Sequence, residues 1–75
     1  MRYAVVIEKA KRNYSAYVPD LPGCVATGKS VHETLLAIRA AIEFHLEGMV
    51  EDGETIPDPA CLVDYADVQI PSATS

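Results

Sequence analysis

The sequence predicts an α+β domain with the element order β-β-β-α-β. Strand-like segments separated by turns fill the chain as far as Thr27, and a helix-capping pattern opens at Ser30. A second β-branched, alternating segment runs from Leu62 to Ile70. Because 75 residues can enclose one hydrophobic core, we expect a single domain over residues 1–70 and a flexible tail over 71–75.

The first two strands are predicted to form a hairpin. Arg2 to Lys9 has an apolar, β-branched centre and charged ends, which is typical of a strand buried on both faces. Ala10 to Asn13 is polar and predicts a turn. Tyr14 to Val18 then alternates between its two faces, which predicts a second strand antiparallel to the first.

The segment Pro19-Asp20-Leu21-Pro22-Gly23 predicts a tight turn. Its two prolines restrict φ and lack an N–H donor, and its glycine can adopt a positive φ. Neither a strand nor a helix can continue through it. Cys24 to Thr27, closed by Gly28, is then expected to be a third strand that pairs with the second.

Ser30-Val31-His32-Glu33 matches a capping box, in which the Ser30 hydroxyl accepts from the Glu33 amide and the Glu33 carboxylate reaches the Ser30 amide. We expect the helix to continue to about Asp52 and to end at Gly53. Its buried face is expected to comprise Val31, Leu35, Ile38, Ile42, His45 or Leu46, and Met49.

After the helix, Ile56-Pro57-Asp58-Pro59 predicts a rigid extended linker, and Leu62 to Ile70 predicts the fourth strand. Both faces of the first and fourth strands carry apolar side chains, whereas one helix can cover only one face of a sheet. We therefore expect an exposed apolar patch or a free sheet edge, and a homo-oligomer that is a dimer or a tetramer.

The charge favours a protein partner over a nucleic acid. The net charge is −5 and the isoelectric point is about 4.7, whereas nucleic-acid binding requires clustered basic residues. Lys9, Lys11 and Arg12 form the one basic cluster, which we interpret as a solvated hairpin tip. A basic protein would complement this chain best.

Cys24 and Cys61 lie too far apart for a paired thiolate metal site, so we interpret both as buried small hydrophobic residues. The sequence has no secretion signal, no apolar run long enough to span a membrane and no lipidation motif. We therefore expect a cytoplasmic protein that does not associate with membranes.

Several of these features together resemble the HicB-type antitoxin family. They are the Tyr-x-Ala-x-Val-Pro-Asp-Leu-Pro-Gly-Cys segment from Tyr14 to Cys24, Gly28, the capped helix and the Ile-Pro-x-Pro linker. The resemblance spans Arg2 to Ile70. It implies a partial ribonuclease-H-like fold, with a four-stranded mixed sheet in the order 3-2-1-4 and the helix on one face. It also implies a bacterial antitoxin that binds and neutralises a small basic HicA-type toxin, which cleaves messenger RNA.

The sequence departs from the family pattern at Lys29, where relatives often carry an acidic residue, and at Thr34, where they often carry alanine. Many full-length relatives also have a DNA-binding segment after the last strand, whereas only Pro71 to Ser75 remain here. We therefore expect no direct DNA binding.

A ribonuclease-H-like fold also raises a nuclease hypothesis, in which carboxylates hold two Mg²⁺ ions. Glu8, Glu43 or Glu47, and Asp64 occupy loosely comparable elements, but we interpret them as solvated surface acids. His32 and His45 lack the i, i+4 spacing of a shared metal site, and no base is visible for Cys24. We therefore expect no enzyme activity, catalytic residue, metal or cofactor.

Three residues are the candidates for contact with a partner: Asp20, Tyr17 and Tyr65. The Asp20 carboxylate can accept backbone amides and lock its turn, or it can face a basic partner, and both interpretations remain open. The alternative function is an orphan oligomeric scaffold or a small-ligand-binding domain that has no toxin partner.

Overall fold

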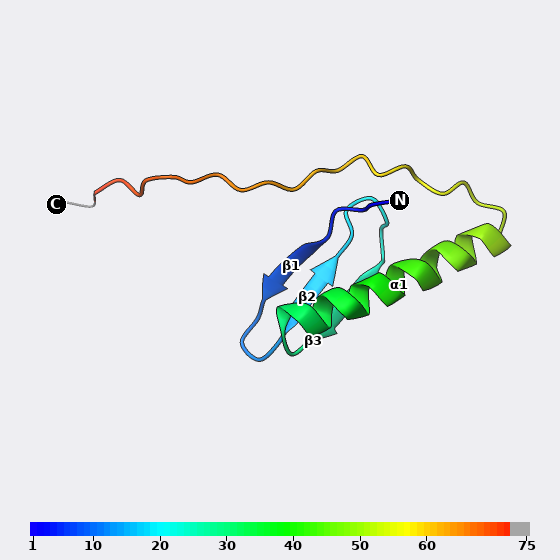
Figure 1. Cartoon of the computed structure of the whole chain (residues 1–75), viewed down its shortest axis with the longest axis horizontal. Helices are drawn as coiled ribbons and strands as arrows, with labels where there is room; N and C mark the ends of the chain where they lie inside the picture. Colours follow the sequence, from blue (N-terminus) through cyan, green and yellow to red (C-terminus); the bar gives the residue numbers. More distant parts are fainter. Residues whose placement is uncertain (73–75) are drawn as a thin grey trace.

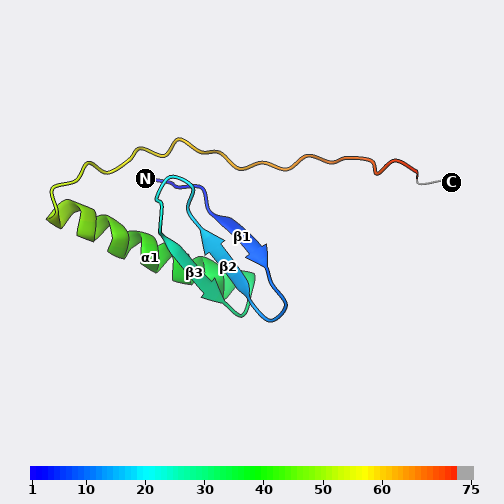
Figure 2. The same ribbon diagram turned by 180° about the vertical axis from the view of Figure 1, so that it is seen from behind.

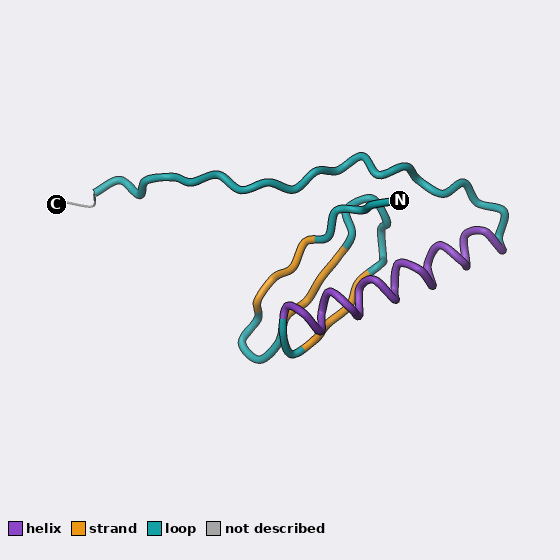
Figure 3. The backbone as a smooth tube through the Cα atoms, viewed as in Figure 1, coloured by secondary structure: helices purple, strands orange, loops and turns teal. Residues whose placement is uncertain are grey.

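The computed structural model describes residues 1–72 and contains a three-stranded sheet, one long helix and an extended C-terminal segment (Figure 1). The elements are β1 (Val6–Lys9), β2 (Tyr14–Tyr17), β3 (Val25–Gly28) and α1 (Val31–Glu51). The trace in Figure 3 shows that the loops within the sheet are short, whereas the described chain after α1 has no regular structure. The predicted α+β class is therefore confirmed.

The three strands form an antiparallel meander in the order β1-β2-β3, as predicted. The first strand is shorter than predicted, because β1 begins at Val6 rather than at Arg2, and none of its residues is fully buried. Ile7 pairs with Ala16, and Ala16 pairs with Ala26, so these three residues form a row across the sheet. Ala16 is buried, and Ile7 and Ala26 pack against the core. Since side chains alternate along a strand, their neighbours point to the opposite, outer face.

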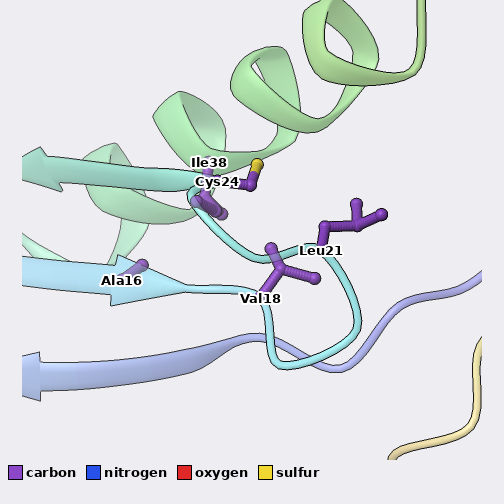
Figure 4. Packing of buried hydrophobic residues seen from close by; sticks show 5 residues of the cluster. All are labelled: Ala16, Val18, Leu21, Cys24 and Ile38. Carbon is purple, nitrogen blue, oxygen red and sulfur yellow. The ribbon is translucent and has the colours of Figure 1, made fainter. Parts of the chain in front are cut away.

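The core lies where the turn after β2 meets the helix, as Figure 4 shows. The buried hydrophobic residues are Ala16, Val18, Leu21, Cys24 and Ile38. The turn closes through backbone bonds, in which the Leu21 amide donates to the Val18 carbonyl and the Cys24 amide to the Leu21 carbonyl. Gly23 takes a φ of 84°, as expected of the residue that reverses the chain. The Pro19 to Gly23 turn thus contributes Leu21 to the core.

Both ends of α1 follow their sequence signals. At the start, the Ser30 hydroxyl accepts from the Glu33 amide at 3.0 Å, as predicted. The Glu33 carboxylate reaches one residue further than expected, because it accepts from the Lys29 amide at 3.1 Å. At the end, Gly53 has a φ of 72° and Glu54 donates to the Met49 carbonyl, which is the Schellman arrangement.

The buried face of α1 differs from the prediction in its first two turns. Thr34 is fully buried, whereas Val31 and Leu35 are about half exposed. The cause is the approach of β3, since a Cβ on Gly28 would lie 2.6 Å from the Thr34 Oγ1. The Thr34 hydroxyl stays satisfied because it donates to the Ser30 carbonyl at 2.7 Å. Thr34 therefore lies where the helix approaches β3 closely.

The helix covers β3 and β2, and its last turns project beyond the sheet (Figures 1 and 2). Ile38 is the helical residue at the centre of the core, with Ala41, Ile42, Leu46 and Met49 packed around it. The edge strand β1 makes far fewer contacts with α1 than β2 and β3 do. One side of the helix therefore remains open next to β1.

The predicted fourth strand is wrong, and so are the mixed sheet and its order 3-2-1-4. Leu62 to Ile70 is extended, but it pairs with no strand of the described chain and runs past the N-terminus and away from β1 (Figure 1). The radius of gyration is 16.0 Å, against about 11 Å for a compact chain of this length. The alternation of side chains along a segment indicates that it is extended and has two different faces, but it does not specify which edge of a sheet the segment joins. Of the predicted tail, residues 73–75 lie outside the described residues.

Candidate functional site

Asp20 anchors the chain that follows the helix. Its Oδ2 accepts hydrogen bonds from the Ala60 amide at 3.0 Å and from the Cys61 amide at 3.1 Å. These two bonds, that from Cys61 first, hold the pKa of the Asp20 carboxyl below its ordinary value of 3.8. The carboxylate therefore accepts backbone amides, as one of the two interpretations held, but from the segment that follows α1 rather than from its own turn.

Tyr3 provides a second attachment for the same segment, since its hydroxyl donates to the Pro57 carbonyl. Burial, and then the nearby Asp20 and Asp58 carboxylates, raise the pKa of Tyr3 above 10.0. The phenol therefore remains a donor at neutral pH. Together, Tyr3 and Asp20 determine where the chain leaves the body of the domain at Cys61.

This anchor should be sensitive to acid. The lowered pKa of Asp20 means that its ionised form is favoured in the folded chain. The contribution of this carboxylate to the free energy of unfolding is therefore complete above pH 3.8, and it is lost as the pH falls through the lower pKa of the folded chain. We expect the Ala60 and Cys61 amide resonances to shift upfield in that acidic window in an NMR titration. Asp20→Asn should abolish this pH-dependent shift. If the shift persisted in that variant, another titrating group would be its cause.

Tyr17 lies on the outer face of the sheet, which α1 does not cover. It is 42% exposed and pairs with Val6 on β1 and with Val25 on β3, so the three side chains form one apolar row across the sheet. Val25 is more exposed than Tyr17. The next row consists of Glu8, Ser15 and Thr27 and is polar. The accessible apolar surface of this face therefore runs from Val6 to Val25.

Tyr65 lies on the extended segment, where its side chain is 93% exposed. Its amide donates to the side chain of the preceding Asp64, a local contact that does not attach it to the domain. The three predicted contact residues therefore occupy different places. Asp20 holds the backbone of residues 60 and 61, Tyr17 lies on the sheet, and Tyr65 lies on the free segment.

The sequence analysis did not identify a hollow between the Pro22 to Val25 segment and the C-terminal half of α1. Its volume is about 670 Å³, and its lining includes Phe44, His45 and Met49. Phe44 is 78% exposed, although aromatic side chains contribute much of the energy of protein interfaces. A signal was present in the sequence, because Phe44 is the one phenylalanine and falls outside the predicted buried face.

An acidic strip runs along the same half of the helix. Glu43, Glu47 and Glu51 follow one another at i, i+4 spacing, so their side chains lie on one side of α1. Asp52 and Glu54 extend the negative charge and line the hollow. The last turn of α1 contains no basic residue that would offset the negative end of the helix dipole. These acids therefore disfavour the isolated helix.

The groups considered for catalysis are dispersed. Within residues 1–72, no three His, Cys, Asp or Glu side chains are placed to hold a metal ion together. Burial raises the pKa of the Cys24 thiol, which disfavours its thiolate. Cys61 is exposed, contrary to prediction, and the Asp20 carboxylate raises the pKa of its thiol. The one helix of the described chain is not long and apolar enough to cross a membrane.

A small sheet with two edge strands, an acidic helix and an exposed aromatic side chain are features typical of a protein-binding module. The model of the HicB-like antitoxins of bacterial toxin–antitoxin systems matches residues 3–70, and the chain belongs to this family. The match covers the meander, the helix and the extended segment. The resemblance noted in the Pro19 to Gly23 turn and the capped helix is thereby confirmed.

Relatives come from a phage, from archaea and from bacteria. An uncharacterized 14.9 kDa protein of Haemophilus phage HP1 is 46% identical over 65 residues, which are 87% of this chain but 49% of the phage protein. The chain thus spans about half of that relative. A UPF0150 protein of Archaeoglobus fulgidus is 46% identical over 59 residues, which are 75% of this chain and 86% of the archaeal protein.

Among solved structures, a chain of the HicA3 and HicB3 toxin–antitoxin complex is similar, with a TM-score of 0.66 and 26% identity. The likeness covers 76% of this chain and 66% of the other. That protein was therefore solved as part of a toxin–antitoxin assembly.

Proposed function

We propose that this protein is an antitoxin that binds and neutralises a small basic toxin of the HicA type. The observation that carries the proposal is the family match over residues 3–70, and the likeness to a chain of a HicA–HicB complex supports it. The protein acts by binding in the cytoplasm, where the toxin would meet messenger RNA, and it has no catalytic step of its own.

The acidic half of α1, with the hollow beside it, is the surface that we assign to the toxin. The hollow combines an exposed aromatic, Phe44, with the carboxylates of Asp52 and Glu54, while Glu43, Glu47 and Glu51 lie on a neighbouring side of the helix. An aromatic side chain can anchor an interface, and the carboxylates complement a basic partner. A bound cationic surface would relieve the repulsion among Glu43, Glu47 and Glu51 and offset the helix dipole. The net charge of −5 supports a basic protein as the partner.

Co-expression tests the pairing directly. The reading frame next to this gene should encode a short basic protein, and the two chains should co-purify when one is tagged. Expression of that neighbour alone should arrest growth, and this chain should restore it. Absence of both the complex and the rescue would contradict the antitoxin proposal and favour the alternative, an orphan scaffold or ligand-binding domain.

Phe44→Ala should weaken toxin binding without destabilising the free chain. The side chain is largely exposed and alanine favours helix, so the free energy of unfolding should change by less than about 0.5 kcal/mol. The dissociation constant should rise by about 30-fold, the effect of removing an interface anchor. Calorimetric titration measures the affinity, with Leu36→Ala, a half-exposed apolar residue of α1 outside the hollow, as the control. Equal affinities of the two variants for the toxin would indicate that Phe44 lies outside the interface.

Glu47→Lys should change stability and binding in opposite directions. It removes like-charge repulsion near the C-terminus of α1 and offsets the helix dipole, so the free energy of unfolding should increase by about 0.3–1 kcal/mol. Toxin affinity should fall by about tenfold or more at low salt, and less at high salt. Glu8→Lys makes the same charge change on the sheet and is the matched control. A larger loss of toxin affinity with Glu8→Lys would indicate that the toxin binds to the sheet instead.

A further inference from the structure

The outer face of the sheet, opposite α1, carries an exposed aromatic residue on its central strand. Tyr17 of β2 is 42% exposed, and its cross-strand neighbours are Val6 on β1 and Val25 on β3. The helix packs on the other face, and the C-terminal segment does not cross the strands in either view (Figures 1 and 2). The toxin surface assigned above does not include Tyr17. Its ring is therefore available to another partner.

A basic tip, formed by Lys9, Lys11, Arg12 and Lys29, lies at one end of the same sheet. Lys9 ends β1, Lys11 and Arg12 follow it in the turn, and all four side chains are exposed. Lys29 directly follows β3, and the β1–β2 turn and the β3–α1 turn lie at the same end of the sheet (Figures 1 and 2). Lys9 and Gly28 occupy one row across the three strands, so their Cα atoms are about 10 Å apart. The structure thus adds Lys29 to the three residues that are clustered in the sequence.

The charges of the chain are separated between its two ends. Four of the six Lys and Arg residues belong to the basic tip, whereas the acidic strip of α1 lies in the C-terminal half of the helix. Two carboxylates lie close to the tip in the chain, those of Glu8 and Glu33, and the Glu33 carboxylate accepts from the Lys29 amide at 3.1 Å. The basic side chains therefore outnumber the acidic ones at this end. The net charge of −5 conceals a positive pole.

An exposed aromatic ring beside a cluster of cations matches the chemistry of a single nucleic-acid strand. Clustered Lys and Arg side chains bind phosphates, and unpaired bases stack on aromatic rings. Tyr17 is four residues from Asn13 of the turn, or about 13 Å along the strand, which a strand of a few nucleotides spans. A lipid surface is disfavoured, because residues 9–13 contain no large apolar side chain that would insert into it.

We propose that the outer face of the sheet binds single-stranded RNA, with a base stacked on Tyr17 and the adjoining phosphates on the basic tip. This inference goes beyond the antitoxin function. Only the choice of RNA over single-stranded DNA rests on that function, because it places the protein beside messenger RNA. The hollow at Phe44 and the acidic strip share no residue with Tyr17 or the basic tip, so the RNA and toxin surfaces are separate.

Fluorescence anisotropy of a labelled single-stranded RNA oligonucleotide tests the basic tip with the chain alone. The dissociation constant should be on the order of 10–100 μM at low salt, and its logarithm should rise with the logarithm of the salt concentration with a slope of about 2–3, as three or four phosphate contacts require. Arg12→Glu should weaken binding by about tenfold and lower this slope, because it reverses a charge at the tip. Arg39→Glu makes the same charge change on the exposed surface of α1 and should have a much smaller effect.

Substitutions of Tyr17 test the stacked base in the same assay. Tyr17→Phe keeps the ring and should bind RNA as the parent does, whereas Tyr17→Thr keeps a strand-forming residue without the ring and should weaken binding by about tenfold. Tyr65→Thr removes an exposed aromatic ring from the C-terminal segment and should leave binding unchanged. Circular dichroism of each variant separates a loss of binding from a loss of folding.

Four results would overturn the proposal. They are no binding of the RNA at low salt, equal effects of Arg12→Glu and Arg39→Glu, unchanged binding by folded Tyr17→Thr, and tighter binding of a DNA duplex, whose paired bases cannot stack on Tyr17. Equally tight binding of poly-glutamate would assign the tip to an acidic protein instead, and tighter binding of single-stranded DNA would overturn the choice of RNA. The assay contains no toxin, so each of these results leaves the antitoxin function standing.

Discussion

Ile38→Ala is expected to lower the free energy of unfolding by about 2–5 kcal/mol, the usual cost of truncating a fully buried aliphatic side chain. Ile38 is the one helical residue among the buried hydrophobic residues, and the other four come from β2 and the turn that follows it (Figure 4). Its removal leaves a cavity where α1 meets the sheet. For a domain of this size, such a loss is a large fraction of the total stability.

Urea unfolding followed by circular dichroism at one fixed chain concentration measures this effect. Ile38→Val removes a single methylene group and should cost about 0.5–1.5 kcal/mol. Leu36→Ala, on the exposed side of the same helix, should change stability by less than about 0.5 kcal/mol. If Leu36→Ala proved as damaging as Ile38→Ala, the assignment of the buried face of α1 would be wrong.

Gly28→Ala should destabilise the fold by about 1–3 kcal/mol, because it forces apart two elements that already touch. A Cβ at this position would lie 2.7 Å from the Thr34 backbone nitrogen, and backbone cannot rotate out of the way. The first turn of α1 would have to shift from β3. That shift would also strain the capping bond between the Ser30 hydroxyl and the Glu33 amide.

Gly48→Ala is the matched control for this change. Gly48 lies inside α1, and a Cβ there would meet nothing within 4 Å. Alanine favours helix over glycine, so this variant should gain about 0.5–1 kcal/mol. Thermal unfolding should therefore move in opposite directions for the two variants. A Gly28→Ala protein as stable as the parent would contradict the close packing of β3 on α1.

Local signals in the sequence were sufficient for most of the compact part of the fold. The alternation in Tyr14 to Val18, the prolines of the turn and the Ser30 cap each specify a conformation over a few residues. The start of α1 and its glycine stop agree with the structure for this reason. The buried side of the first helical turns was harder to predict, because it depends on how closely Gly28 of β3 approaches Thr34.

Contacts between distant segments could not be predicted in this way. The β-branched alternation of Leu62 to Ile70 favours an extended chain, but whether that chain pairs depends on where Asp20 and Tyr3 hold its base. The bonds that Asp20 accepts come from Ala60 and Cys61, far along the chain, and no local pattern encodes them. Similarly, Tyr17 was identified as a contact candidate by residue type, whereas its place in a row across the sheet required the strand register.

Inhibition of RNA cleavage in a purified system tests the central claim most directly. The basic protein encoded beside this chain should cleave messenger RNA, and cleavage should stop as this chain approaches one copy per toxin. The Phe44→Ala variant should stop cleavage only at a clearly higher concentration, whereas the Leu36→Ala variant should stop it at the same concentration as the parent chain. Undiminished cleavage in a molar excess of this folded chain would contradict the antitoxin function.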